Sequence, residues 1–158
     1  MSQTAAAATG DDRIELGEMA GSIGFLLRIA QVQVFEEFYE ALSAHDMKPG
    51  EFTVLWVIHL NPGLRQGTIA RALRIKPAHM TKLVARLADA GYVSRITPAD
   101  DRRSVRLMLT SSGKAFVRKN RDELINFHKA ERSRLDDDEF VQFAALLRKF
   151  TGIPEARP

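Results

Sequence analysis

Two short helical segments joined by a tight turn, followed at once by a change to alternating hydrophobicity, constrain the fold of this chain most strongly. The first helix is predicted over residues 67–73, and the second opens with Pro77 and runs to about residue 90. Gly91 follows, and a glycine without Cβ strain is common just past the end of a helix. Helices joined by a turn of three or four residues are typical of a helix-turn-helix motif.

The pattern after Gly91 predicts a β-hairpin. Residues 92–96 alternate as a half-buried strand does, residues 104–109 are predicted as a second strand, and the polar segment 97–103 lies between them. Two such runs around a turn-rich segment indicate antiparallel strands. The loop carries basic residues, so we expect the hairpin to act as a wing beside the second helix of the motif.

Helical periodicity extends on both sides of this centre. Pro49 suits the first turn of a helix, and Asp136 and Glu139 have the spacing of a capping box. The sequence therefore predicts a mainly α fold with a small β-hairpin wing, in which further helices cover residues 14–43, 51–60, 113–134 and 137–150.

Charge is distributed unevenly along the chain. The net charge is −6 over residues 1–60, +7 over residues 61–110 and +2 over residues 111–158. A basic module in a chain of net charge +3 is expected of a phosphate-binding surface. A solvated basic surface without a partner is the alternative, and charge alone leaves both open.

Composition excludes several classes of protein. The chain has no cysteine, so disulfides, thiolate metal sites and a cysteine nucleophile are excluded. No apolar run approaches the roughly 18 residues that a membrane span needs, and the first residues lack the features of a secretory signal. We expect a cytoplasmic protein without a membrane partner, with a disordered tail over residues 1–13.

Nothing in the sequence favours an enzyme. No G-x-S-x-G, P-loop or G-x-G-x-x-G motif occurs. The acidic run 136–139 is explained by helix capping and the helix dipole. Neither a cofactor nor a metal site is expected, because the four histidines match no metal-ligand spacing: His45, His59, His79 and His128.

Three stretches carry a resemblance to a known family. Residues 67–73 resemble its first motif helix, residues 77–93 its recognition helix and exit, and residues 101–110 its wing, where a D-x-R element precedes an L-x-L-T ending. In these motifs and in the order of elements over residues 14–153, the chain is similar to the MarR family of winged helix-turn-helix regulators. It departs from many relatives at Arg65, where they have Thr or Ser before the first motif helix.

The resemblance implies a ligand-responsive regulator of transcription. Residues 46–111 would form the winged helix-turn-helix DNA-binding domain, and residues 14–45 and 112–153 the helices of a homodimer interface. Such a dimer binds a pseudo-palindromic operator in double-stranded DNA, usually as a repressor. A small effector, often an aromatic acid, releases it, and the sequence leaves open whether this is a free acid or its coenzyme A thioester. A winged-helix module that binds protein instead of DNA is the alternative function.

The second motif helix supplies most of the candidate DNA contacts. The N-terminal residues of this helix face the bases in a helix-turn-helix complex, and the major groove is where base pairs can be distinguished. Arg86, one turn further on, would contact the DNA backbone or close an internal salt bridge. The candidates on this helix are Lys76, Pro77, Ala78, His79, Thr81, Lys82 and Arg86.

The wing supplies the remaining candidates. By the resemblance, Arg103 enters the narrow minor groove, whose negative potential attracts arginine, and Asp101 orients it. Arg102 lies near the tip, and Ser104 and Arg106 are candidates for phosphate contacts.

An effector pocket is predicted where the helices expected over residues 14–43, 51–60 and 113–134 meet. Aromatic side chains would line it, and a basic side chain would pair with the anion of the effector. Aromatic residues at helical spacing are more often ordinary core residues, so that alternative stays open. The candidates are Phe35, Phe52, Trp56 and His59, with Arg28 as the anion partner.

Overall fold

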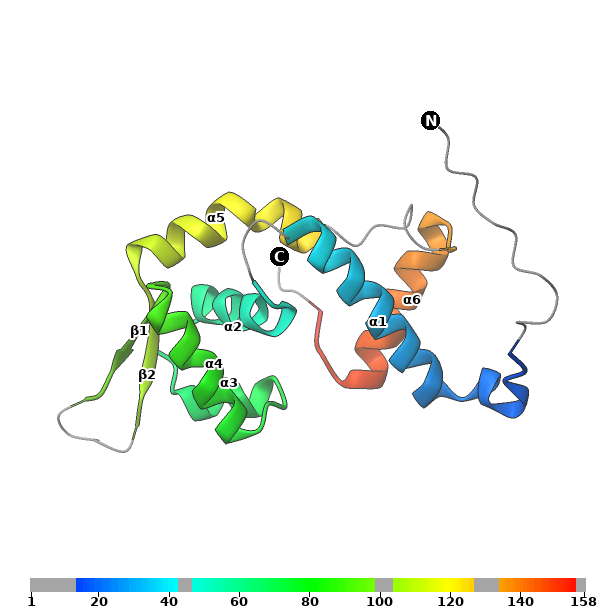
Figure 1. Cartoon of the computed structure of the whole chain (residues 1–158), viewed down its shortest axis with the longest axis horizontal. Helices are drawn as coiled ribbons and strands as arrows, with labels where there is room; N and C mark the ends of the chain where they lie inside the picture. The colour runs from blue at the N-terminus through cyan, green and yellow to red at the C-terminus, as the bar shows by residue number, and fades with distance from the viewer. Residues whose placement is uncertain (1–13, 43–46, 99–103, 127–133, 156–158) are drawn as a thin grey trace. The chain divides into compact units, whose positions relative to one another are not determined.

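The computed structural model describes residues 14–42, 47–98, 104–126 and 134–155 (Figure 1). Contacts within the chain divide it into residues 1–35 and residues 36–158. The described part is mainly helical with one antiparallel hairpin, as the sequence predicts. Its elements are the 3-10 helix η1 (Gly17–Gly21), α1 (Ile23–Leu42), α2 (Pro49–Leu60), α3 (Gln66–Ala72), α4 (Pro77–Asp89), β1 (Val93–Ile96), β2 (Arg106–Leu109), α5 (Ser111–Asn126) and α6 (Asp137–Thr151).

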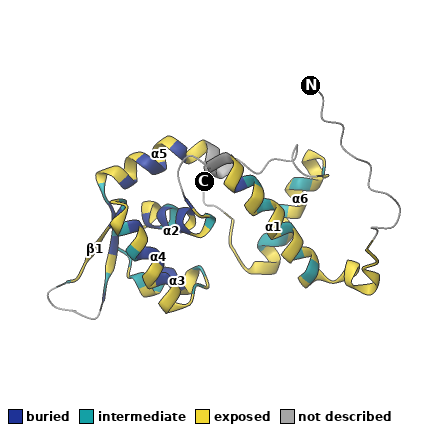
Figure 2. Cartoon of the chain, in the orientation of Figure 1, coloured by how far each residue is buried: buried dark blue, intermediate teal, exposed yellow. Residues whose placement is uncertain are grey.

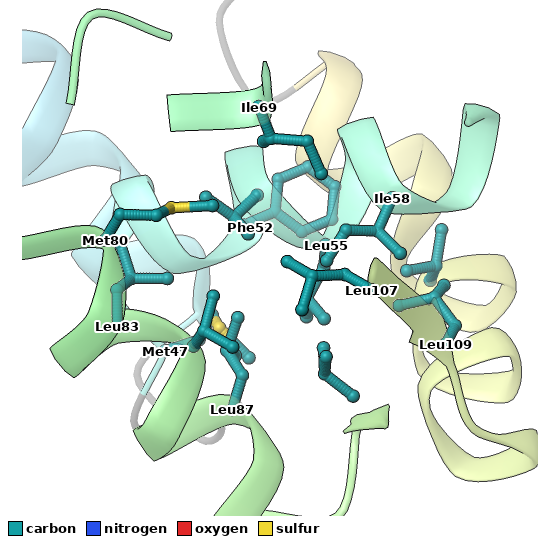
Figure 3. Packing of buried hydrophobic residues seen from close by; sticks show 14 of the residues in the cluster. Met47, Phe52, Leu55, Ile58, Ile69, Met80, Leu83, Leu87, Leu107 and Leu109 are labelled. Atoms are coloured by element: carbon teal, nitrogen blue, oxygen red, sulfur yellow. The ribbon is translucent and has the colours of Figure 1, made fainter. Parts of the chain in front are cut away.

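The core lies among α2, α4, the hairpin and α5 (Figure 2). Helix α2 is apolar over most of its surface, and Val54, Leu55 and Ile58 are 0% exposed. Figure 3 shows side chains from α3, α4 and β2 gathered around this helix. A helix that is apolar nearly all round is stable only when other elements surround it, so α2 is the centre on which the motif is built.

Helix α4 is strongly amphipathic. Its buried residues are spaced i, i+3, i+4 and i+7, and Thr81, Lys82 and Arg86 between them are exposed. This spacing produces one apolar stripe along a helix. The stripe packs into the core and leaves the opposite side free, and it consists of Met80, Leu83, Val84 and Leu87.

The segment between α2 and α3 pairs with strand β2 of the hairpin, which the sequence does not predict. Strands β1 and β2 pair with Val93 opposite Leu109. The backbone after α2 runs along the other side of β2, where Gly63 N donates to Leu107 O at 2.9 Å and Leu107 N donates to Leu64 O at 3.0 Å. This pairing joins the start of α3 to the base of the wing.

The N-terminal helix differs from the prediction of one helix over residues 14–43. The structure has η1, then Ser22 in an extended conformation, then α1. Gly17 has a φ of 52° and Gly21 ends η1, and glycine both permits such backbone and weakens a helix. The prediction is therefore wrong for the first turns, while Ser43 lies outside the described residues.

The C-terminal helices also differ in their bounds. A single helix was expected over residues 113–134, but Arg134 lies in a turn just before α6. Residues 127–133 lie outside the described part. The capping box is confirmed, because Glu139 N donates to Asp136 Oδ1 at 2.8 Å and Asp136 N donates to Glu139 Oε2 at 3.0 Å. Capping therefore accounts for the acidic run. Among the described helices, none has the length and hydropathy of a membrane span.

Two helices carry large exposed apolar side chains. On α6 no residue is buried, and of the α1 residues whose burial is described only Phe38 belongs to the core. The exposed set includes Ile23, Leu26, Ile29, Val32 and Phe35 on α1, and Val141, Phe143, Leu146 and Phe150 on α6.

Helix α5 begins in close contact with the end of α4. Thr110 Oγ1 accepts a hydrogen bond from Gly113 N at 3.0 Å and donates one to Gly91 O at 2.6 Å. Thr110 N also donates to Tyr92 O at 3.0 Å. Gly113 lies directly against the Tyr92 carbonyl, and a Cβ built on it would overlap that oxygen. The approach of the two segments requires glycine at this position.

We expect Gly113→Ala to lower the free energy of unfolding by about 2–3 kcal/mol, as overpacking against backbone does. Gly67→Ala is the matched control, because a Cβ there meets nothing within 4 Å, and replacing a helical glycine stabilises a helix by up to about 1 kcal/mol. Urea denaturation measures both. Equal effects of the two substitutions would contradict the close approach.

Candidate nucleic-acid interface

The exposed side of α4 brings together most of the residues that the sequence predicts. Lys76 is the N-cap and Pro77 the first residue of the helix. Ala78, His79 and Lys82 are exposed beside them. The first turn contains no acidic residue, and none occurs in the sequence between Glu51 and Asp89. Two lysines therefore add to the positive end of the helix dipole, which favours an anionic ligand.

Thr81 is exposed but its hydroxyl is already engaged. It donates to Pro77 O at 3.0 Å and accepts from Gln66 Nε2 at 3.3 Å. The second bond joins the first residue of α3 to α4. The sequence does not predict the role of Gln66, because no local pattern marks a pair 15 residues apart on two different helices.

Arg86 forms the internal salt bridge that was one of its two predicted roles. Its Nε lies 2.9 Å from Glu51 Oε1, and the Glu51 side chain is only 7% exposed, compared with 42% for Arg86. The other oxygen of Glu51 accepts a hydrogen bond from Lys48 N at 2.9 Å. Glu51 thus connects the start of α2 to the last turn of α4.

Sequence analysis did not single out Glu51. The available signal was its place in the first turn of a helix that opens with Pro49, where a glutamate commonly reaches back to the N-cap backbone. Its second partner could not be predicted, because that contact depends on how α2 and α4 pack.

The wing residues are described only at their base. Asp101, Arg102 and Arg103 lie outside the described residues, so their roles remain predictions. Ser104 is 7% exposed, which disfavours the phosphate contact predicted for it. Arg106 is exposed, and its Nη1 donates to Gly63 O at 3.1 Å, so part of its guanidinium holds the turn before α3.

A groove lies between α3 and the base of the wing. Its volume is about 400 Å³, and no acidic residue lines it. Arg71 on its wall donates from Nη2 to Thr68 Oγ1 at 3.5 Å. Sequence analysis did not single out Arg71, and it noted Arg65 only as a departure at the helix cap, where the structure shows no capping bond from the side chain. The groove is lined by Arg65, Gln66, Gly67, Thr68, Arg71, Ser104 and Val105.

The candidate effector residues fall into two groups. On α2 the ring centroids of Phe52 and Trp56 are 6.0 Å apart, and those of Trp56 and His59 are 5.8 Å apart. Phe52 is buried and His59 exposed, so this row leads from the core to the surface. Arg28 and Phe35 are exposed on α1, within residues 1–35. The pocket that would join the groups stays a prediction.

Sequence comparisons find regulators of transcription. The model of the MarR family matches residues 47–105. A protein of Thauera aromatica assigned to transcriptional regulation of the hcr operon is 33% identical over 134 residues, which cover 84% of this chain and 81% of that protein. An HTH-type transcriptional repressor of Mycobacterium tuberculosis is 30% identical over 97 residues, 61% of this chain and 70% of the repressor.

Solved structures share the fold. The transcriptional repressor CouR bound to a 23-mer DNA duplex has a TM-score of 0.80 at 28% identity, covering 89% of this chain and 99% of CouR. CouR bound to p-coumaroyl-CoA has a TM-score of 0.79 at 24% identity, covering 90% and 100%. These relatives are regulators and not enzymes, which agrees with the expectation from the sequence.

We expect Glu51→Gln to lower the free energy of unfolding by about 1–2 kcal/mol, because it removes a charge from a nearly buried ion pair. Asp122→Asn is the control, since the Arg121–Asp122 pair is exposed on both sides and such pairs contribute little. Denaturant titration compares the variants. If Glu51→Gln cost no more than Asp122→Asn, the stabilising role of Glu51 would be wrong.

Proposed function

This chain belongs to the MarR family of transcriptional regulators, and from that premise we propose that it is a repressor that binds a pseudo-palindromic operator as a homodimer and leaves it when a small effector binds. The observation that carries the proposal is the exposed, basic N-terminal side of α4. Its buried stripe holds the helix on the core, so the other side is rigid and available to the major groove.

Base recognition is assigned to the exposed N-terminal residues of α4. His79 and Lys82 offer hydrogen-bond donors to base edges or phosphates, and Ala78 is small enough to approach a thymine methyl. Thr81 contributes by holding Gln66, and Arg86 by holding α4 through Glu51.

Phosphate contacts are assigned to the cations around α4. Lys76 at the mouth of the helix and Arg65 and Arg71 in the groove beside the wing would bind the backbone, which positions a protein on DNA without reading its sequence. In the wing, Arg103 oriented by Asp101 would enter the minor groove. The complex of CouR with a DNA duplex supports DNA as the partner of this fold.

Dimerisation is assigned to residues 14–45 and 112–153. Exposed apolar residues recur every three or four positions on both helices, as in the stripes that a partner subunit covers: Ile23, Leu26, Ile29, Val32 and Phe35 on α1, and Phe143, Leu146 and Phe150 on α6. A two-fold dimer would place two copies of α4 about 34–36 Å apart, one turn of DNA. Residues 46–111 would then be the DNA-binding domain of each subunit.

The proposed effector is an aromatic acid or its coenzyme A thioester. The aromatic row on α2 offers a surface for a planar ring, and Arg28 offers a partner for an anion. CouR bound to p-coumaroyl-CoA supports the thioester as the first compound to test.

We expect tight, salt-sensitive binding to the duplex upstream of the chain's own gene, measured by fluorescence anisotropy, because phosphate contacts release counterions. Lys82→Ala should weaken binding roughly tenfold, since a good base contact contributes about 1–3 kcal/mol. Lys149→Ala removes the same charge from α6 and should leave the affinity unchanged. One aromatic thioester or acid of a panel should release the DNA. A folded dimer that binds no duplex at low salt would instead favour the protein-interaction module.

We expect Leu146→Glu to convert the dimer into a folded monomer, because Leu146 is 60% exposed in the protomer and a charge there would be buried without a partner in the dimer. Ala145→Glu places the same charge about a quarter-turn away on α6, on the side opposite Phe143 and Phe150. Sedimentation equilibrium gives the mass. If Leu146→Glu sediments as the dimer, the assignment of α6 to the interface is contradicted.

A further inference from the structure

Arg74 occupies a backbone conformation that normally requires glycine. Its φ is 54°, and no other non-glycine residue of the described chain has a positive φ. In this region the Cβ of an L-residue crowds the backbone, and glycine avoids the strain. Arg74 lies in the turn between α3 and α4, three residues before Pro77.

Two backbone hydrogen bonds at the end of α3 explain why Arg74 has a left-handed conformation. Arg74 N donates to Arg71 O at 3.1 Å and Ile75 N donates to Ala70 O at 2.9 Å. This pair of bonds defines the Schellman motif, in which the residue after the C-cap is left-handed and usually glycine. Arg74 is that residue.

The end of α4 shows the usual solution within the same chain. Gly91 N donates to Ala88 O and Tyr92 N donates to Leu87 O, each at 2.9 Å, and Gly91 has a φ of 78°. The two motif helices therefore end in the same way, but one has glycine at the strained position and the other has arginine.

Interactions of the Arg74 side chain with the rest of the described protein do not offset the strain in its backbone. It is exposed, and among the described residues its guanidinium makes no hydrogen bond or ion pair. Strain that persists without an internal contact points to a role in function. The surroundings say which role: Arg71 and Lys76 are exposed cations on either side, and the DNA-facing end of α4 follows directly.

We propose that Arg74 binds a phosphate of the DNA backbone at the edge of the groove that α4 enters, and that the strained turn is kept because it holds this guanidinium there. A guanidinium presents paired donors that match two phosphate oxygens. The inference rests on the proposed function, since it needs DNA as the partner. It adds that arginine at residue 74 lowers the stability of the fold and raises the affinity for DNA.

The test is Arg74→Gly, measured for both stability and DNA binding. Relief of the strain should raise Tm by about 2–4 °C. Loss of one phosphate contact in each subunit should make the negative slope of log K, the association constant, against log salt shallower by about 2. It should also weaken binding roughly tenfold. The loss should be equal for operator and unrelated duplexes, because a phosphate contact carries no sequence information.

Two further variants separate the causes. Arg74→Ala should lose the same affinity without the gain in Tm, since alanine keeps the strained Cβ. Arg118→Ala removes an exposed charge from α5 and should change neither the affinity for DNA nor Tm. Unchanged affinity and salt slope in Arg74→Gly, with wild-type protein binding its operator, would overturn this inference alone. A lower Tm, or a loss confined to the operator, would also overturn it. A wild-type chain that binds no duplex would overturn the proposed function as well.

Discussion

Burial of one apolar stripe of α4 in the core that it shares with α2, α3 and the hairpin is the constraint on which the rest of the structure depends. Met80 and Val84 are completely buried, while Thr81 and Lys82 between them are exposed. Because an amphipathic helix gains most of its stability from that packing, the opposite side can carry cations and small side chains that contribute little to folding. Function and stability thus occupy opposite sides of the same helix.

Polar contacts refine the position that burial sets. Glu51 holds Arg86 from the start of α2, and Gln66 holds Thr81 from the start of α3. The backbone before α3 pairs with β2, so the base of the wing and the motif share one hydrogen-bonded framework. A dimer built from such subunits would present helices and wings in a fixed relation, which recognition of a two-fold operator requires.

The sequence predicts what depends on neighbours along the chain. Pro77 and Gly91 mark the ends of α4 closely, and the period of the apolar residues identifies its buried stripe. The partner of Glu51, the pairing of Gly63 and Leu64 with β2, and the Gln66–Thr81 bond all join residues far apart in sequence, so no local pattern contains them. The prediction of one continuous helix is wrong at its start, because it gives the apolar periodicity more weight than the helix-weakening effect of Gly17 and Gly21. Arg74 was missed because its importance lies in a φ angle that composition does not reveal.

Hydroxyl-radical footprinting of the upstream duplex shows whether two copies of α4 contact adjacent turns of DNA. We expect two protected segments related by two-fold symmetry, with centres about 10–10.5 base pairs apart and with further protection in the minor groove where the wings bind. Protection of a single segment, or protection without symmetry, would rule out a dimer that places its two α4 helices in adjacent turns.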